Sequence, residues 1–306
     1  MKLSVIIPCY NEESNVNLFH DEFAKAFKKF KYEYELIFVN DGSKDNTIGE
    51  LKKIVKNSKN NVKVVNFSRN FGKEAAMYAG LKEADGDFVS FIDADLQQRP
   101  EVLYDMFNIL VENDEYDCVG AFQDVRSEGK VLSFFKDSFY KLINKISDVR
   151  FVRGASDFRV FRKTVRDAMV EMGEKNRFTK GIFSFVGFNT YFMPYKAEER
   201  ANGESKWSFV SLFKYAIGGI VAFSTLPLKV ATFLGGFTIV GSFIYLLISL
   251  ILGVELTTMM LFFLISFFSG VQLLVIGVFS QYMAMMYSEV KNRPVYIAKE
   301  VISNKK

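Results

Sequence analysis

The residues best suited to chemistry lie in the segment DADLQQRPE, which directly follows an apolar run ending at Ile92. Its two aspartates, Asp93 and Asp95, are two positions apart, so both side chains can face the same way in an extended segment. Two close carboxylates repel each other unless positive charge lies between them. A hard divalent cation that also binds phosphate oxygens supplies such a charge. The pair therefore indicates a site for a metal ion and a diphosphate.

Two other groups of polar residues occur later in the chain. Asp157, in GASDFRVFRK, precedes an alternating apolar segment, and the alternative interpretation is a surface aspartate beside Arg159. Arg200 and Lys206 lie in EERANGESKW, a glycine-containing loop just before a strongly apolar stretch. A flexible loop with these two cations suits the binding of phosphates. Its alternative is a plain basic segment beside a membrane.

Composition and motifs exclude several other kinds of site. The single histidine, His20, excludes multi-histidine zinc sites and disfavours a Ser-His-Asp triad. Neither G-x-x-x-x-G-K-[ST] nor G-x-G-x-x-G occurs, which argues against a kinase or a dinucleotide oxidoreductase. A net charge of +4 is too small to indicate nucleic-acid binding. Cys9 and Cys118 fall in predicted strands, where a buried free thiol is expected.

The elements that position these residues alternate between strand and helix up to about residue 200. Apolar strands are predicted at 3–7, 36–39, 62–67, 88–92 and 118–122. This alternation predicts an α/β fold with a doubly wound, mostly parallel sheet. Such sheets bind ligands at the carboxyl ends of their strands. Polar segments follow the first four strands, at 9–12, 40–47, 68–73 and 93–97.

The last third of the chain is strongly apolar. No residue is ionised at neutral pH between Lys229 and Glu255, and none from Leu256 to Ser288. Each segment exceeds the about 20 residues that a transmembrane helix needs, so we expect two spans joined near Gly253 as a hairpin. Basic residues flank the pair and its loop has none, which places both ends in the cytoplasm. A buried hairpin in a soluble core is the alternative.

The domain organisation follows from these segments. The stretches 131–146 and 207–223 are typical of helices at a membrane surface, with an ordinary core helix as the alternative for either. The N-terminus lacks the features of a signal peptide, so the first domain is expected to stay where it is made. We expect a catalytic domain at 1–206, a juxtamembrane interfacial helix at 207–228, two transmembrane helices at 229–288 and a cytoplasmic tail at 289–306.

Together these segments resemble the family-two glycosyltransferases of the polyprenyl-phosphate type, which include dolichyl-phosphate mannose synthases and bacterial bactoprenol glucosyltransferases. The motifs span nearly the whole chain: VIIPCYNEE, NDGSKDNT, FSRNFGKEAAMYAG, DADLQQRPE, SDFRVF, RANGESKW and SEVKNRPVY. The hairpin resembles that of the bacterial enzymes. One departure is Gln98-Arg99, where the family usually has an acidic or amide residue and then proline, but Pro100 and Glu101 keep the frame.

The resemblance implies a GT-A fold and a set of roles for the donor site. The nucleotide base and ribose would be held by four residues: Pro8, Tyr10, Glu12 and Asp41. Asp93 would contact the nucleotide end, and Asp95 would bind Mg²⁺ or Mn²⁺ on the diphosphate. The nucleotide-sugar is then the first partner, with UDP-glucose as the first expectation and UDP-N-acetylglucosamine as the second.

The resemblance also implies an acceptor and a location. Asp157 would lie near the acceptor, and Arg200 and Lys206 would close over the phosphates. The implied reaction is an inverting transfer of a hexose to undecaprenyl (polyprenyl) phosphate, for modification of cell-envelope glycans. The protein would be a multi-pass protein of the bacterial cytoplasmic membrane, in contact with the lipid bilayer and with its catalytic domain in the cytoplasm. A homo-oligomer, a flippase and a downstream transferase are further partners to test.

Three other functions compete with this one. A processive polysaccharide synthase needs more spans and a Q-x-x-R-W motif, whereas the only tryptophan here, Trp207, lies in GESKW. A transferase with another lipid acceptor, such as a diacylglycerol or a ceramide, would share most of the same motifs. An inactive scaffold that binds a nucleotide-sugar is the third, and the intact acidic pair with Asp157 argues against it.

Overall fold

The computed structural model of the chain describes residues 1–123, 154–195, 226–252 and 258–304, together with residues 144, 152 and 224. The predicted surface helices at 131–146 and 207–223 lie outside this part of the chain, apart from residue 144. Arg200 and Lys206 lie outside it as well.

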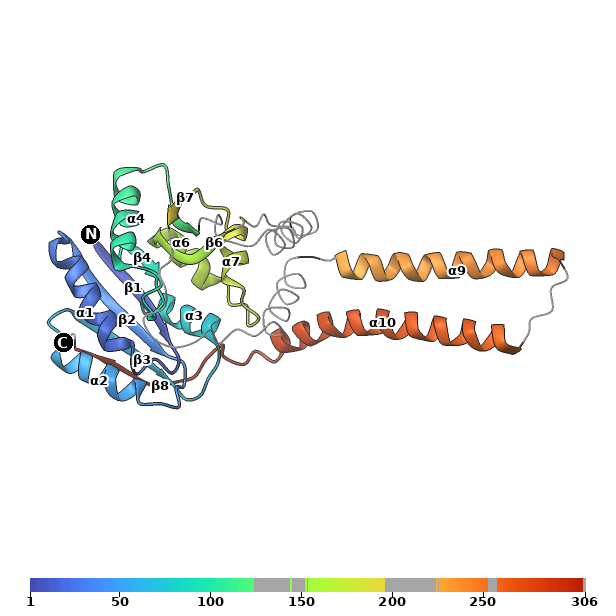
Figure 1. Ribbon diagram of the computed structural model, residues 1–306, viewed down its shortest axis with the longest axis horizontal. Helices are drawn as coiled ribbons and strands as arrows, with labels where there is room; N and C mark the ends of the chain where they lie inside the picture. Colours follow the sequence, from blue (N-terminus) through green and yellow to red (C-terminus); the bar gives the residue numbers. More distant parts are fainter. Residues whose placement is uncertain are drawn as a thin grey trace. The chain divides into compact units, whose positions relative to one another are not determined.

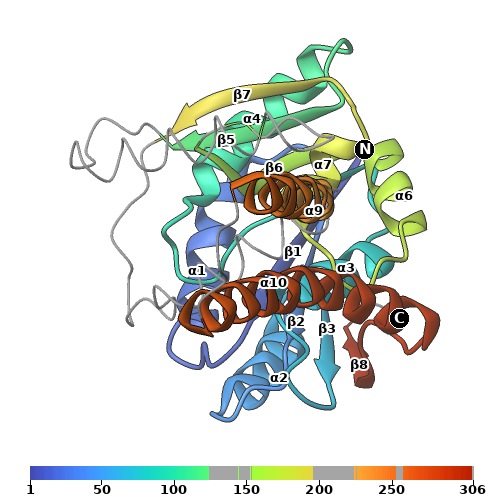
Figure 2. The same ribbon diagram turned by 90° about the vertical axis from the view of Figure 1, so that its right-hand side faces the viewer.

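A mixed, mostly parallel sheet forms the centre of the α/β unit (Figure 1). Its strands in the described residues are β1 (Lys2–Cys9), β2 (Glu33–Asn40), β3 (Asn61–Phe67), β4 (Phe88–Phe91), β5 (Cys118–Gln123), β6 (Ala155–Arg162), β7 (Thr190–Tyr195) and β8 (Ala298–Ser303). Their order is β7-β5-β6-β4-β1-β2-β3-β8, with β7 and β8 at the two ends (Figure 2). The pairs β1–β2, β1–β4, β2–β3 and β5–β7 are parallel, and β4–β6, β5–β6 and β3–β8 are antiparallel. The predicted α/β sheet is confirmed.

Helices cover both faces of this sheet. In the described residues, the helices of the α/β unit are α1 (Val16–Ala26), the 3₁₀ turn η1 (Phe27–Lys29), α2 (Thr47–Asn57), α3 (Lys73–Glu83), α4 (Pro100–Glu112), α6 (Lys163–Glu171) and α7 (Thr179–Phe185). Helix α1 contacts both α2 and α4 on one face, and α3 contacts α6 on the other. The core between the sheet and α1, α2 and α4 includes fully buried Leu3, Val5, Phe19, Phe23 and Phe107.

The first helix shows how the sequence pattern builds this core. Phe19 and Phe23 recur at helical spacing and are fully buried, and each such side chain contributes about 1.5–3 kcal/mol on burial. Phe27 continues the same face, with its ring stacked on Phe23 at a centroid distance of 4.1 Å. The helix itself ends at Ala26, so Phe27 belongs to η1 and Phe30 to the extended segment after it.

The C-terminal segment, which we expected to be a tail, contains a strand of the sheet. β8 pairs antiparallel with β3, and the backbone N–H of Ser68 donates to the carbonyl of Ile297 at 3.0 Å. The ring of Tyr296 stacks on Phe67 at 4.9 Å. The chain after the last long helix therefore returns to the α/β unit and completes one end of its sheet.

Helices α9 (Leu226–Leu252) and α10 (Thr258–Val290) contact each other and form a second unit. They fall on the two segments for which the sequence predicts spans. Large apolar side chains are exposed on them, including Phe237 at 79% and Ile251 at 81%. Among the described residues, one helical segment, Phe267–Val290, has the length and apolar composition needed to cross a membrane. The segment joining the two helices, 253–257, lies outside the described residues.

Candidate active site

The loops after β1 and β2 form one connected surface at the carboxyl ends of these strands. The backbone N–H of Asn11 donates to Ser43 Oγ at 2.9 Å, and the N–H of Lys44 donates back to Asn11 Oδ1 at 2.8 Å. The N–H of Glu12 donates to Thr47 Oγ1 at 2.8 Å. These reciprocal bonds fix the two segments that the resemblance assigns to the nucleotide.

Asp41 ties the loop after β2 to the loop after β3. Its carboxylate accepts hydrogen bonds from the backbone N–H groups of Phe71 (2.6 Å) and Gly72 (2.9 Å) and from Asn70 Nδ2 (2.9 Å). Burial raises the pKa of Asp41, and the bonds from Phe71 and Gly72 partly oppose that rise. Both carboxylate oxygens therefore bind protein donors, and the predicted contact of Asp41 with the nucleotide stays a prediction.

The other residues expected at the nucleotide lie at the same edge of the sheet. Pro8 is the next-to-last residue of β1, and Tyr10 follows that strand; both are partly exposed. Glu12 Oε2 accepts a hydrogen bond from Asn15 Nδ2 at 2.6 Å, just before α1 begins. The structure thus brings Pro8, Tyr10, Glu12 and Asp41 to one edge, as the sequence predicts.

Asp93 and Asp95 lie in the loop after β4, and Asp93 is held from two sides. Lys73 Nζ lies 2.6 Å from Asp93 Oδ1. Gln98 accepts a bond from the Asp93 backbone N–H at 3.0 Å and donates one to Asp93 Oδ2 at 3.3 Å. Asp95 Oδ1 accepts a bond from the backbone N–H of Gln97 at 3.2 Å. Gln98, at the point where the sequence departs from the family pattern, therefore orients one of the two key carboxylates.

Three carboxylates act on the charge of the Lys73 ammonium, and one of them, Asp93, is in contact with it. Desolvation lowers the pKa of Lys73, but the charges of Asp93, Asp157 and Asp95 outweigh it and raise the pKa above its ordinary value. The Lys73 side chain keeps 42% of its surface accessible, so solvent screens these interactions. Asp157, which comes from β6, thus lies close enough to the Asp93–Asp95 loop for the charges to act on the same lysine.

Asp157 is not a plain surface aspartate. Its Oδ1 atom is buried and has no hydrogen-bond partner among the described residues. Arg159, the neighbour that the alternative interpretation paired with it, is buried; its Nε donates to the carbonyl of Ser156, and its guanidinium lies 4.3 Å from the centroid of the Phe183 ring. A buried acceptor without a partner is suited to bind a ligand.

The donor set fits a metal ion that shares its ligands with a substrate. Asp93, Asp95 and Asp157 supply hard carboxylate oxygens, which suit Mg²⁺ and Mn²⁺. In the described residues, no three His, Cys, Asp or Glu side chains lie close enough together to hold an ion by themselves. Oxygens from a bound diphosphate would complete such a site.

Three residues that contribute to this cluster were given no role from the sequence. Glu74 Oε2 accepts a bond from the backbone N–H of Thr179 at 2.9 Å; burial and the charge of Asp157 raise the pKa of Glu74. Burial and then the charges of the two loop aspartates raise the pKa of Tyr195 in β7. Lys73 and Glu74 belong to FSRNFGKE, one of the four polar strand ends, so their motif marked the place. For Tyr195 no sequence signal existed.

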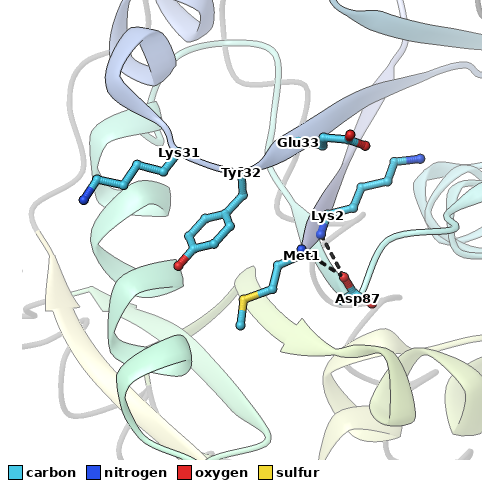
Figure 3. A pocket seen from close by; sticks show the side chains of 6 residues that line it. All are labelled: Met1, Lys2, Lys31, Tyr32, Glu33 and Asp87. Carbon is cyan, nitrogen blue, oxygen red and sulfur yellow. Dashed lines mark hydrogen bonds and ion pairs between the residues drawn. The ribbon is translucent and has the colours of Figure 1, made fainter.

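A separate pocket lies at the opposite edge of the sheet (Figure 3). Its volume is about 340 Å³, and it is lined by residues at or next to the amino ends of β1, β2 and β4: Met1, Lys2, Lys31, Tyr32, Glu33 and Asp87. The backbone N–H of Lys2 donates to Asp87 Oδ2 at 2.8 Å. None of the predicted site residues lines this pocket, so it is not the candidate active site.

Comparison with known proteins identifies the family. The family model described as Glycosyl transferase family 2 matches residues 4–168, more than half of the chain. The putative glycosyltransferase CsbB of Bacillus subtilis (strain 168) is 40% identical over 309 residues, covering 99% of this chain and 93% of that protein. The SfII prophage-derived bactoprenol glucosyl transferase of Shigella flexneri is 39% identical over 309 residues, covering 98% of each.

One solved structure with a similar chain trace is glucosyl-3-phosphoglycerate synthase from Mycobacterium tuberculosis in complex with Mn²⁺, uridine-diphosphate and phosphoglyceric acid. Its TM-score is 0.49 at 19% identity, covering 72% of this chain and 76% of that one. The mixed, mostly parallel sheet described above is the α/β architecture of the GT-A fold. By its sequence over nearly its full length, the chain belongs to glycosyl transferase family 2.

Proposed function

We propose that the protein is an inverting glycosyltransferase that transfers a hexose from UDP-glucose or UDP-N-acetylglucosamine to undecaprenyl phosphate or another polyprenyl phosphate. The observation that carries this proposal is the 39% identity to a bactoprenol glucosyl transferase over 98% of both chains. That similarity extends beyond the α/β unit into α9 and α10. The lipid-linked sugar would supply the modification of cell-envelope glycans.

The donor site is proposed at the carboxyl ends of β1 to β4. The connected loops that carry Tyr10, Glu12 and Asp41 would bind the nucleotide, and Asp93 and Asp95 would face its diphosphate. When bound through Asp95 and the diphosphate, Mg²⁺ or Mn²⁺ would stabilise the negative charge of the leaving group. Arg200 and Lys206 are proposed to add positive charge from the loop that precedes the apolar segments.

The transfer step needs little proton chemistry. An oxygen of the acceptor phosphate forms a bond to the anomeric carbon on the face opposite the diphosphate. The bond from that carbon to the diphosphate oxygen breaks, and its electron pair leaves with the nucleotide. A phosphate monoester has a second pKa of about 6, so it is mostly ionised at neutral pH. No strong base is then needed, so Asp157 of β6 is proposed to position the acceptor and not to deprotonate it.

We further propose that α9 and α10 form a transmembrane hairpin in the bacterial cytoplasmic membrane, with the α/β unit in the cytoplasm. The exposed apolar side chains of both helices support this proposal, as does the length of Phe267–Val290. A reporter fused after Lys306 should then report the cytoplasm, whereas a tag inserted at Gly253 should be accessible from outside. The same side for both would contradict the hairpin.

The reaction is tested with membranes that contain the full-length protein, undecaprenyl phosphate and a panel of radiolabelled UDP- and GDP-sugars. We expect one sugar to enter the lipid extract in a metal-dependent manner, with EDTA abolishing transfer and Mg²⁺ or Mn²⁺ restoring it. Asp95→Asn should abolish transfer, whereas Asp105→Asn, the same change at an exposed position of α4, should not. Full transfer in EDTA would contradict the metal assignment, and no transfer from any sugar would favour the scaffold.

The chemistry of the product tests the acceptor. A sugar–phosphate–lipid should be cleaved by mild acid, should largely survive mild base and should contain phosphorus. A labelled glycolipid without phosphorus would overturn the polyprenyl-phosphate assignment and leave the diacylglycerol-type acceptor in its place.

A further inference from the structure

Lys73 stands at a position that local helix energetics disfavour. It is the first residue of α3, directly after Gly72. The amino end of a helix carries partial positive charge, so a cation there is unfavourable. Its ammonium lies against Asp93 Oδ1 at 2.6 Å and within the fields of Asp95 and Asp157. The lysine is therefore held at this helix end by the acidic cluster.

The charges of this cluster have a specific balance. With all four groups in their usual ionised forms, the three aspartates and Lys73 carry a net charge of −2. Without the lysine the same aspartates would carry −3 and would attract a divalent cation more strongly. The Oδ1 atom of Asp93 that Lys73 occupies would also become available.

We propose that Lys73 is a positioning residue whose positive charge keeps the acidic cluster from binding a divalent cation by itself. The metal then binds together with the nucleotide diphosphate. This inference rests on the proposed function, because it concerns the same metal–diphosphate site. The lysine holds Asp93 on one side while Gln98 holds it on the other, which fixes the loop before any ligand arrives.

The size of the effect follows from Coulomb's law. A unit charge and a divalent cation about 6 Å apart repel each other enough to weaken binding about tenfold even at the dielectric constant of water. Lys73 is partly exposed, so the water value is a lower bound when the ionic strength is low enough that salt does not screen the charges. Removing its charge should tighten metal binding in the absence of nucleotide by at least tenfold.

The test measures Mn²⁺ binding to the full-length protein in detergent by the paramagnetic resonance signal of free Mn²⁺, with and without UDP. Lys73→Gln should bind Mn²⁺ at least tenfold more tightly than the wild type without UDP. The factor by which UDP tightens Mn²⁺ binding should fall accordingly. Lys73→Arg keeps the charge and should behave as the wild type. Lys82→Gln removes an equal charge from the same helix at a residue that stacks over Tyr78, and it should also leave Mn²⁺ binding unchanged.

A charge-compensated variant separates electrostatics from misfolding. In the double variant Lys73→Gln with Asp93→Asn the net charge returns to −2, so nucleotide-free Mn²⁺ affinity should return toward that of the wild type. Unchanged or weaker Mn²⁺ binding by Lys73→Gln, at a native thermal midpoint, would overturn the inference, as would a double variant as tight as the single one. Wild-type protein that binds no Mn²⁺ even with UDP would overturn the proposed metal dependence itself. UDP-dependent binding with no effect of Lys73 would overturn the role of the lysine alone.

Discussion

At Gly42 the loop after β2 lies directly against the backbone of the loop after β3. Gly42 has a φ of +61°, in the left-handed region that favours glycine. A Cβ atom placed on it would lie 2.2 Å from the carbonyl carbon of Arg69 and 2.4 Å from the backbone nitrogen of Asn70. These are backbone atoms, so no side-chain rotation can relieve the overlap. Gly42→Ala must therefore push the loops after β2 and β3 apart.

The cost of Gly42→Ala has two parts. An alanine in the left-handed region costs about 1–2 kcal/mol. Overpacking costs about 1–3 kcal/mol, and here it also strains the hydrogen bonds that Asn70 and Phe71 donate to Asp41. We expect a total of about 2–5 kcal/mol, which corresponds to a fall in thermal midpoint of roughly 4–20 °C for a unit of this size. Affinity for UDP should fall with it, because the displaced loops border the proposed nucleotide site.

Gly187→Ala provides the matched control. Gly187 also has a positive φ, +69°, but the nearest atom to a Cβ atom placed on it is the carbonyl oxygen of Phe185, at an ordinary contact distance of 3.9 Å. Its substitution therefore adds backbone strain without the steric overlap. The thermal midpoint of full-length protein in detergent, followed by circular dichroism, and UDP titration should both show a larger loss for Gly42→Ala than for Gly187→Ala. Equal losses, or a Gly42→Ala protein as stable as the wild type, would refute the reasoning.

Two further predictions concern residues behind the site. The folded-state pKa of Glu74 lies above its unfolded value. The stability that the Glu74 carboxyl contributes is therefore fully present below the unfolded pKa of about 4.3, and it is lost as pH rises through the folded pKa. Glu74→Gln keeps an acceptor for Thr179 but removes the buried charge, so it should raise the thermal midpoint at pH 8. The gain should vanish near pH 4, where the Glu74 carboxyl is protonated, and a lower midpoint at pH 8 would contradict this prediction. Glu300 in β8 accepts a bond from Asn66 Nδ2 at 3.0 Å and pairs with Lys52 at 2.8 Å. Glu300→Ala should lower the free energy of unfolding by about 1–3 kcal/mol, because it leaves the buried Asn66 amide without this acceptor. Glu300→Gln keeps the acceptor and should lower it by under about 1 kcal/mol, as measured by thermal or urea unfolding. Equal losses would show that the pair with Lys52 dominates.

The central strands could be predicted from the sequence because they are buried on both faces. Parallel strands covered by helices read as continuous apolar runs, and the predicted strands at 3–7, 36–39 and 62–67 coincide with β1, β2 and β3. The end strands carry no such signal. β7 contains Pro194, which an edge position tolerates, and β8 reads AKEVIS, in which the charged Lys299 and the apolar Val301 share the exposed side.

The places of the site residues were predicted better than their partners. The rule that ligands bind at the carboxyl ends of parallel strands located Asp41, Asp93 and Asp95 correctly at one edge. The rule does not report which side chains from other loops reach them. Lys73 and Asp93 are 20 positions apart, and Asp41 and Phe71 are 30 apart, so only the packed fold brings these pairs together.

Those partners change what the acidic residues can do. Motif reasoning treats Asp41 and Asp93 as carboxylates that await a ligand, but each already accepts hydrogen bonds or an ion pair that joins two loops. The buried Asp41 carboxylate, which accepts three bonds from protein donors, therefore contributes mainly by fixing the shape of the loops around it. Asp157 is the contrasting case, because its buried Oδ1 atom has no partner among the described residues. An acceptor atom that the protein leaves without a hydrogen bond is the one most readily satisfied by a substrate. The different roles of these acidic residues therefore follow from their hydrogen-bond partners and not from the motif.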